Sequence, residues 1–155
     1  MTDSGRTADS RMKCGEIMTR NVRTATSSMP MRDVAQAMLE GDMGSIPVVD
    51  DGKLIGIVTD RDIVVRAIAN GKGPETPVGE VMTTQLFTVK PDDYLFEAIR
   101  LMGDKQVRRI PVVNEDGSLA GIISMADVAL ETEDEREIAE TLEEISSGSS
   151  FWRKS

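Results

Sequence analysis

The chain has no histidine and a single cysteine, Cys14, among its 155 residues. Without histidine, a Ser-His-Asp or Cys-His catalytic group and acid–base catalysis by imidazole are excluded. The same shortage leaves almost no ordinary ligands for zinc, and one cysteine cannot form an intrachain disulfide. Because a chain without disulfides suits a reducing compartment, we expect a cytoplasmic protein. The shortage of histidine and cysteine leads us to expect no metal site and no enzymatic activity.

Long apolar runs are also missing. No stretch approaches the roughly 20 apolar residues that cross a bilayer, and the first residues lack the apolar region of a signal peptide. Acidic residues outnumber basic ones by 27 to 18, for a net charge of -9. This balance argues against general binding to nucleic acids or to anionic membranes. Much of the negative charge lies in residues 131–144, so the rest of the chain remains able to hold a local anion site.

What the sequence does contain is an internal repeat. Each copy has an apolar-Pro-Val-Val segment, an acidic turn with glycine, and the pattern Gly-apolar-apolar-(Thr/Ser)-x-x-Asp. One copy is too small for a stable core of its own, so we expect the two to pack on each other. The matching positions include Pro47 and Pro111, Gly56 and Gly121, Met18-Thr19 and Met82-Thr83, and Thr24 and Thr88.

Hydrophobic periodicity predicts the order β-α-β-β-α in each copy. Serines are expected to cap the first helix and aspartates the corresponding helix of the second copy, and Gly41 is expected to end the first helix. The capping residues are Ser27, Ser28, Asp92 and Asp93. The expected strands are 22–24, 46–49, 54–58, 86–89, 109–113 and 119–123, and the expected helices are 31–40, 94–105 and those starting at 60 and 125.

Composition divides the chain into five parts. They are a disordered terminus (1–13), the first repeat (14–70), a linker rich in glycine and proline (71–77), the second repeat (78–132) and an acidic helix with a tail (133–155). In the last part, Ile138, Leu142 and Ile145 form a narrow apolar seam. We expect residues 134–145 to dock on the repeats or across a dimer interface, with Phe151 and Trp152 either anchoring the end or reaching a partner. The alternative is a solvated acidic tail.

The double motif resembles the CBS (cystathionine β-synthase) domain pair, also called a Bateman module, over residues 15–131. The resemblance implies an α/β fold of two tandem β-α-β-β-α repeats related by a pseudo-two-fold axis, and a homodimer formed through the helices. It also implies a regulatory, non-catalytic role. The module would bind an adenine nucleotide (AMP, ADP, ATP, NAD or S-adenosylmethionine) and pass its state to a regulated partner protein that the sequence does not name.

The start of the last helix in each repeat is the expected ligand site. Thr59 and Ser124 follow apolar strands, where free N–H groups and the helix dipole favour an anion. Asp62 and Asp127, one turn later, can accept hydrogen bonds from both hydroxyls of a ribose. In the CBS family these positions contact the ribose and phosphate of the ligand. The plainer interpretation is an N-cap followed by an acid that complements the helix dipole.

The resemblance further implies two clefts, each combining the (Thr/Ser)-x-x-Asp of one repeat with the residues that lead into the Pro-Val-Val strand of the other. Guanidinium groups suit phosphate, so the cleft with arginines is the stronger candidate, although a solvated arginine pair is the plainer interpretation. Isoleucines and prolines, including Ile57 and Ile122, would form the adenine walls. The first cleft comprises Thr59, Asp62, Arg108, Arg109, Ile110 and Pro111, and the second comprises Ser124, Asp127, Gly44, Ser45, Ile46 and Pro47.

A different class of function fits the same sequence. The chain would then be a protein-interaction or scaffold module whose ligand pockets are degenerate and whose acidic C-terminal helix is the working surface. Binding of adenine nucleotides in solution separates this alternative from the sensor.

Overall fold

A computed structural model describes residues 12–131 and 143–145 of the chain. The expected disordered terminus and most of the expected acidic helix and tail, including Ile138, Leu142, Phe151 and Trp152, lie outside the described residues. The chain divides into two compact units. Unit 1 comprises Met1–Val22, Phe87–Glu115 and Ala120–Ser155, and unit 2 comprises Arg23–Leu86 and Asp116–Leu119.

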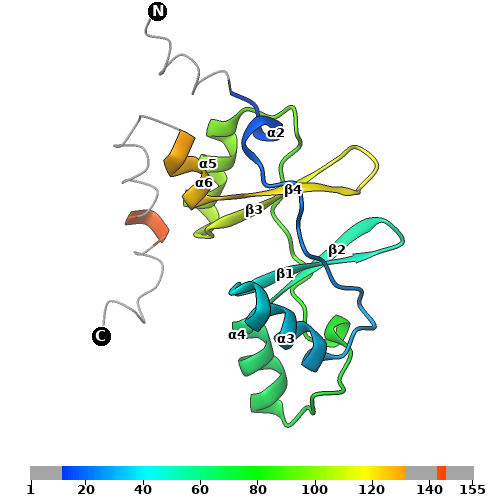
Figure 1. Cartoon of the computed structure of the whole chain (residues 1–155). Coiled ribbons are helices and arrows are strands. Elements are labelled where there is room, and N and C mark those ends of the chain that lie inside the picture. The colour runs from blue at the N-terminus through cyan, green and yellow to red at the C-terminus, as the bar shows by residue number, and fades with distance from the viewer. Residues whose placement is uncertain (1–11, 132–142, 146–155) are drawn as a thin grey trace, which may run out of the picture. The chain divides into compact units, whose positions relative to one another are not determined.

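Unit 2 is built around an antiparallel hairpin of β1 and β2 (Figure 1). The hairpin turn has positive φ at Asp51 and Gly52 (51° and 77°), a backbone that suits a tight hairpin and that aspartate and glycine tolerate. A helix with three kinds of turn follows β2 directly. The elements are α3 (Met31–Gly41), β1 (Ser45–Asp50), β2 (Lys53–Thr59), α4 (Asp60–Asp62), a π turn (Ile63–Ala67), and 3-10 turns (Ile68–Asn70 and Val78–Glu80).

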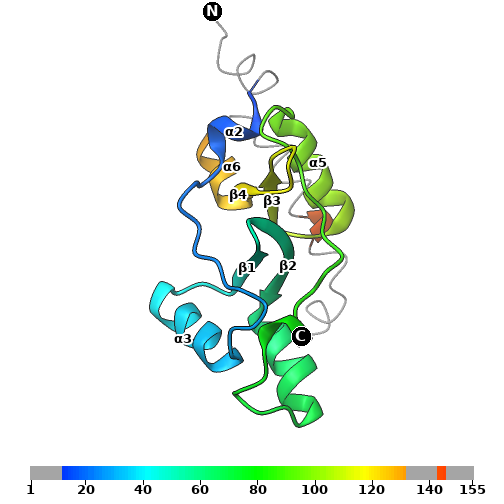
Figure 2. The same ribbon diagram turned by 90° about the vertical axis from the view of Figure 1, so that its right-hand side faces the viewer.

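Unit 1 contains the second hairpin apart from its turn and Leu119, and α2 contacts both α5 and α6 (Figure 2). Its core joins the hairpin to these helices, because Leu95 and Met102 of α5 and Val128 of α6 are buried in one cluster with Ile110 and Ile123 of the strands. A separate cluster forms the core of unit 2. The elements are α2 (Cys14–Ile17), α5 (Leu95–Lys105), β3 (Arg109–Val113), β4 (Leu119–Ser124) and α6 (Met125–Glu131).

The segment that leads into each repeat belongs to the unit of the other repeat. In unit 1, the Thr19 N–H donates to the Ile122 carbonyl (2.8 Å) and the Ile122 N–H donates back to Thr19 (3.0 Å). In unit 2, Thr83 and Ile57 form the same reciprocal pair, at 2.7 and 2.9 Å. Each compact unit therefore combines the hairpin of one repeat with the lead-in segment of the other, whereas the sequence repeats run continuously along the chain.

The first strand of each repeat is shorter than expected. In place of strands at 22–24 and 86–89, the structure has isolated parallel bridges, Ala25 with Val48 and Val89 with Val112. The remaining strands and helices lie within one or two residues of the predicted bounds. No helix among the described residues has both the length and the apolar composition needed to cross a membrane.

The helix caps differ from the predicted ones. Pro30 is the N-cap of α3 and has no polar side chain, so this helix has no side-chain cap. The Ser27 hydroxyl and N–H both donate to Asp50 instead. These hydrogen bonds hold the pKa of Asp50 below its ordinary value. Tyr94 is the N-cap of α5, whereas the Asp93 carboxylate accepts from the Lys90 N–H (2.8 Å). Ser28 and Asp92, the other two expected caps, likewise do not cap these helices. Asp42 (φ 51°), not Gly41, is the left-handed residue that ends α3.

Candidate ligand site at two helix starts

Thr59 and Asp62 form a reciprocal capping box at the start of α4. The Asp62 N–H donates to Thr59 Oγ1 and the Thr59 N–H donates to Asp62 Oδ2, both at 3.0 Å. Ser124 and Asp127 repeat the arrangement at the start of α6, at 3.1 and 3.2 Å. The capping role that the plainer interpretation assigned to these residues is therefore present. It occupies one oxygen of each carboxylate and leaves acceptor capacity for other donors.

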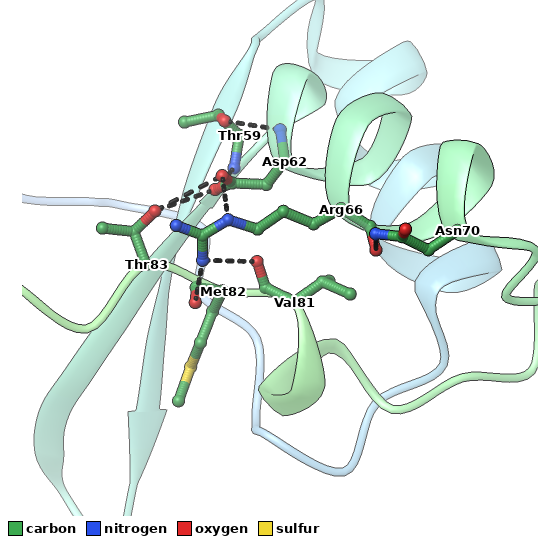
Figure 3. Close-up of polar contacts among 7 residues, drawn as sticks. All are labelled: Thr59, Asp62, Arg66, Asn70, Val81, Met82 and Thr83. Carbon is green, nitrogen blue, oxygen red and sulfur yellow. Dashed lines mark hydrogen bonds and ion pairs between the residues drawn. The ribbon is translucent and has the colours of Figure 1, made fainter.

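The Asp62 carboxylate is enclosed by polar groups (Figure 3). The Thr83 hydroxyl donates toward both of its oxygens at 3.3 Å, and Arg66 Nε lies 3.7 Å from Oδ1. Asp62 is 8 % exposed, and it is the single charged or polar side chain classed as buried within the described residues. A buried carboxylate needs such partners, because desolvation without compensation would disfavour its charge.

Asp127 is less enclosed. It is half-buried, and the Thr19 hydroxyl contacts its Oδ2 at 3.5 Å. Thr19 and Thr83 thus contact the two aspartates from the lead-in segments. Neither threonine was assigned to a site from the sequence. The signal was available, since Met18-Thr19 and Met82-Thr83 hold matching positions in the repeat.

Two glycines allow the lead-in segments to approach the strands this closely. A Cβ on Gly56 would lie 2.6 Å from Met82 Sδ and 2.9 Å from the Thr83 carbonyl oxygen. A Cβ on Gly121 would lie 2.6 Å from the Thr19 carbonyl oxygen. The glycine of each motif therefore secures the position of the threonine that reaches the aspartate.

The residues leading into the Pro-Val-Val strands lie beside the helix of their own repeat. Ser45 is opposite Thr59 in the hairpin, and the Asp60 N–H donates to the Gly44 carbonyl (2.9 Å). In unit 1, the Met125 N–H donates to the Arg108 carbonyl (2.9 Å). The expected clefts join Thr59 and Asp62 of unit 2 with arginines of unit 1, and Ser124 and Asp127 of unit 1 with Gly44 and Ser45 of unit 2. Both combinations stay predictions.

The residues expected to form adenine walls differ in accessibility. Ile46 and Ile110 are 1 % and 0 % exposed and belong to the cores of their units. Pro47 and Pro111 are buried as well, whereas Ile57 and Ile122 are half-buried. Any apolar contact with a ligand is therefore available first to Ile57 and Ile122. Arg108 and Arg109 are exposed.

Cys14 lacks the properties of a reactive thiol. Burial, with the charges of Asp93 and Glu97 added, raises its pKa to about 12. The reactive form of cysteine is the thiolate, so the side chain behaves as part of the core of unit 1. Within residues 12–131 and 143–145, no group of three or more cysteine, aspartate or glutamate side chains is arranged to hold a metal ion.

The comparisons with known proteins agree with this architecture. The family model for the CBS domain matches residues 14–68 and 78–134. CBS domain-containing protein YhcV of Bacillus subtilis is 39% identical over 115 residues, which cover 74% of this chain and 81% of YhcV.

Two similar crystal structures contain adenosine-based ligands. CBSX2 in complex with AMP has a TM-score of 0.68 and 29% identity, over 76% of this chain and 93% of CBSX2. The CBS domain pair of protein MJ0100, in complex with 5′-methylthioadenosine and S-adenosyl-L-methionine, has a TM-score of 0.67 and 25% identity, over 77% and 94% of the two chains. The predicted α/β fold with tandem repeats is confirmed, and the chain belongs to the CBS domain family, with two CBS domains in sequence.

Proposed function

We propose that this protein is a non-catalytic sensor that binds an adenine nucleotide and passes its state to a partner protein. One observation carries the proposal. At each of the two helix starts, an aspartate that caps the helix also meets a threonine hydroxyl from the lead-in segment. This is a ribose-type site, because a carboxylate accepts from hydroxyl groups and a hydroxyl both donates and accepts. The AMP and S-adenosyl-L-methionine in the similar structures support the ligand class.

The phosphate contact is the second part of the proposal. Thr59 and Asp62 would bind the ribose, and the exposed Arg108 and Arg109 of the other repeat would bind the phosphates. The cleft with Ser124, Asp127, Gly44 and Ser45 has no guanidinium group from these positions, so it would bind adenosine-like ligands with less help from phosphate.

Assembly into a homodimer is the third part. Large apolar side chains are exposed on helices of both units: Leu39 (80%), Val64 (55%), Ile68 (62%) and Leu130 (83%). Val64 and Ile68 lie four residues apart in one helical stretch, and a contiguous exposed apolar surface is typical of contact sites. The partner that best fits these exposed helices is a second copy of the chain, since CBS pairs associate through their helices. Light scattering of the unaltered protein should give twice the mass of the chain. A double variant, Val64→Lys with Ile68→Lys, should give the mass of one chain.

A thermal-shift screen tests the proposed ligand class. The screen compares AMP, ADP, ATP, NAD, S-adenosylmethionine and adenosine with GMP and GTP as controls. A specific ligand present at 100 times its dissociation constant should stabilise the fold by about 2.7 kcal/mol. If no adenine ligand raises the melting temperature more than the guanine controls do, the sensor proposal fails and the scaffold function takes its place.

A further inference from the structure

The two (Thr/Ser)-x-x-Asp motifs differ one turn beyond the aspartate. Arg66 follows Asp62 by four residues, and Glu131 follows Asp127 by four, so the charge is reversed between the repeats. The helix after Asp62 also contains the π turn Ile63–Ala67, whereas α6 is an ordinary α-helix. Such turns are rare and occur often at functional sites. The two sites thus share a cap but not its surroundings.

Arg66 joins the buried carboxylate to the backbone that precedes Thr83 (Figure 3). Its Nε faces Asp62 Oδ1 at 3.7 Å, while Nη1 donates to the Met82 carbonyl at 3.1 Å and reaches the Val81 carbonyl at 3.5 Å. The planar guanidinium makes these contacts at once, which a lysine amine cannot reproduce. One side chain therefore holds both the aspartate and the lead-in segment.

These contacts fix the orientation of Asp62 from three sides. The Thr59 N–H, the Thr83 hydroxyl and Arg66 all meet its carboxylate. At Asp127 the corresponding contacts of Ser124 and Thr19 are longer, 3.2 and 3.5 Å. A carboxylate has about four acceptor positions, so about one remains at Asp62 for a ligand hydroxyl while these three contacts are kept. Binding to a group that is already ordered costs less conformational entropy than binding to a mobile one.

We infer that Arg66 is a positioning residue of the Asp62 site. It holds the Asp62 carboxylate and Thr83 in the arrangement that receives the ribose, and it makes this site bind the nucleoside part of the ligand more tightly than the Asp127 site does. The inference rests on the proposed function, and it assigns Arg66 no contact with phosphate. Loss of Arg66 should therefore weaken adenosine and AMP binding by the same factor.

Calorimetry of paired arginine variants tests this inference. Both variants carry Asp127→Ala, so that the Asp62 site is measured alone. Arg66→Ala should weaken adenosine and AMP binding equally, by about tenfold. Arg61→Ala removes the same charge from an exposed position of the same helix and should leave both affinities unchanged. Arg66→Lys should recover only part of the loss. Unchanged adenosine affinity in Arg66→Ala, or a much larger loss for AMP than for adenosine, would overturn the inference.

Hydrogen exchange without ligand keeps this test separate from the proposed function. The Thr83 and Ile57 amides pair with each other's carbonyls, so their exchange reports how firmly the lead-in segment is held. Arg66→Ala should speed exchange at Thr83 by about tenfold, and Arg61→Ala should not. If the unaltered protein binds neither adenosine nor AMP, the proposed function fails, and exchange alone decides whether Arg66 anchors this segment. Unchanged exchange at Thr83 would overturn the anchoring in either case.

Discussion

At the scale of single residues, Asp62 combines a structural and a binding role. Its carboxylate caps α4 and is buried, yet it is the group that we expect to accept from a ribose. A substitution there therefore acts on stability and on affinity together. A loss of binding has meaning only when the melting temperature of the variant is measured alongside it, since removal of a cap costs about 1 kcal/mol by itself.

Asp62→Ala should weaken adenine-nucleotide binding by about 1.5–3 kcal/mol, the range for a hydrogen bond to a charged group. Calorimetry measures the affinity, and circular dichroism checks the fold. Asp60→Ala is the matched control, because Asp60 is exposed and lies in the same first turn. A folded Asp62→Ala variant with unchanged affinity would contradict the proposed ribose contact.

The two arginines should act on phosphate instead. Arg108→Ala and Arg109→Ala are expected to weaken AMP binding by about 1.5–3 kcal/mol, because a guanidinium group forms charge-assisted hydrogen bonds with phosphate. Adenosine has no phosphate, so its binding should change little. The loss of AMP affinity should persist when either substitution is combined with Asp127→Ala and should disappear when it is combined with Asp62→Ala. Calorimetry of the double variants measures both cases. A ligand-bound structure with phosphates near Gly44 and Ser45, and none near either arginine, would contradict the predicted combination.

Cys14 should resist alkylation in the native protein. Burial, helped by Asp93 and Glu97, raises its pKa from 9.0 to about 12, so the thiol stays protonated as the pH rises through 8 and 9. Mass spectrometry after iodoacetamide treatment at pH 8 should show slow labelling of the folded chain and rapid labelling in urea. Equal rates in the two conditions would show that this thiol is accessible.

At the scale of elements, the glycine in each motif sets how closely a lead-in segment approaches its strand. Gly56→Ala and Gly121→Ala should each destabilise the fold by about 1–3 kcal/mol, because the added methyl group meets backbone oxygen at less than contact distance. Urea denaturation measures the change. Gly73→Ala is the control, since nothing lies within 4 Å of that position and its φ is ordinary. Equal stabilities of the three variants would show that the close approach is unimportant.

The hairpins and main helices were predictable from the sequence because their apolar patterns are strong and local. The caps were not, because Ser27 is drawn to Asp50, 23 residues away, rather than to its own helix. The same limit applies to the site. Thr59 and Asp62 are visible as a repeated motif, whereas Thr83 reaches Asp62 only through tertiary pairing with β2. The π turn Ile63–Ala67 has no signature in the apolar pattern.

At the scale of the whole molecule, the question is whether the C-terminal region packs against the rest of the fold. Of the expected seam, Ile145 alone lies among the described residues, and it is 7 % exposed. Truncation after Glu133 should lower stability by about 1.5–3 kcal/mol, the value of burying one such side chain. Calorimetric melting and light scattering measure the effect. If the truncated chain keeps both its melting temperature and its mass in solution, the region does not dock, and its acidic surface becomes the better candidate for contact with a partner.

The exchange of lead-in segments has a consequence for synthesis on the ribosome. Most of unit 2 has been synthesised once residue 86 is added, and domains generally fold during translation. The N-terminal segment is made earlier, yet Cys14 and Thr19 pair with Asp93 and Ile122, which emerge much later. Cys14 and Thr19 must therefore remain without these partners while unit 2 folds.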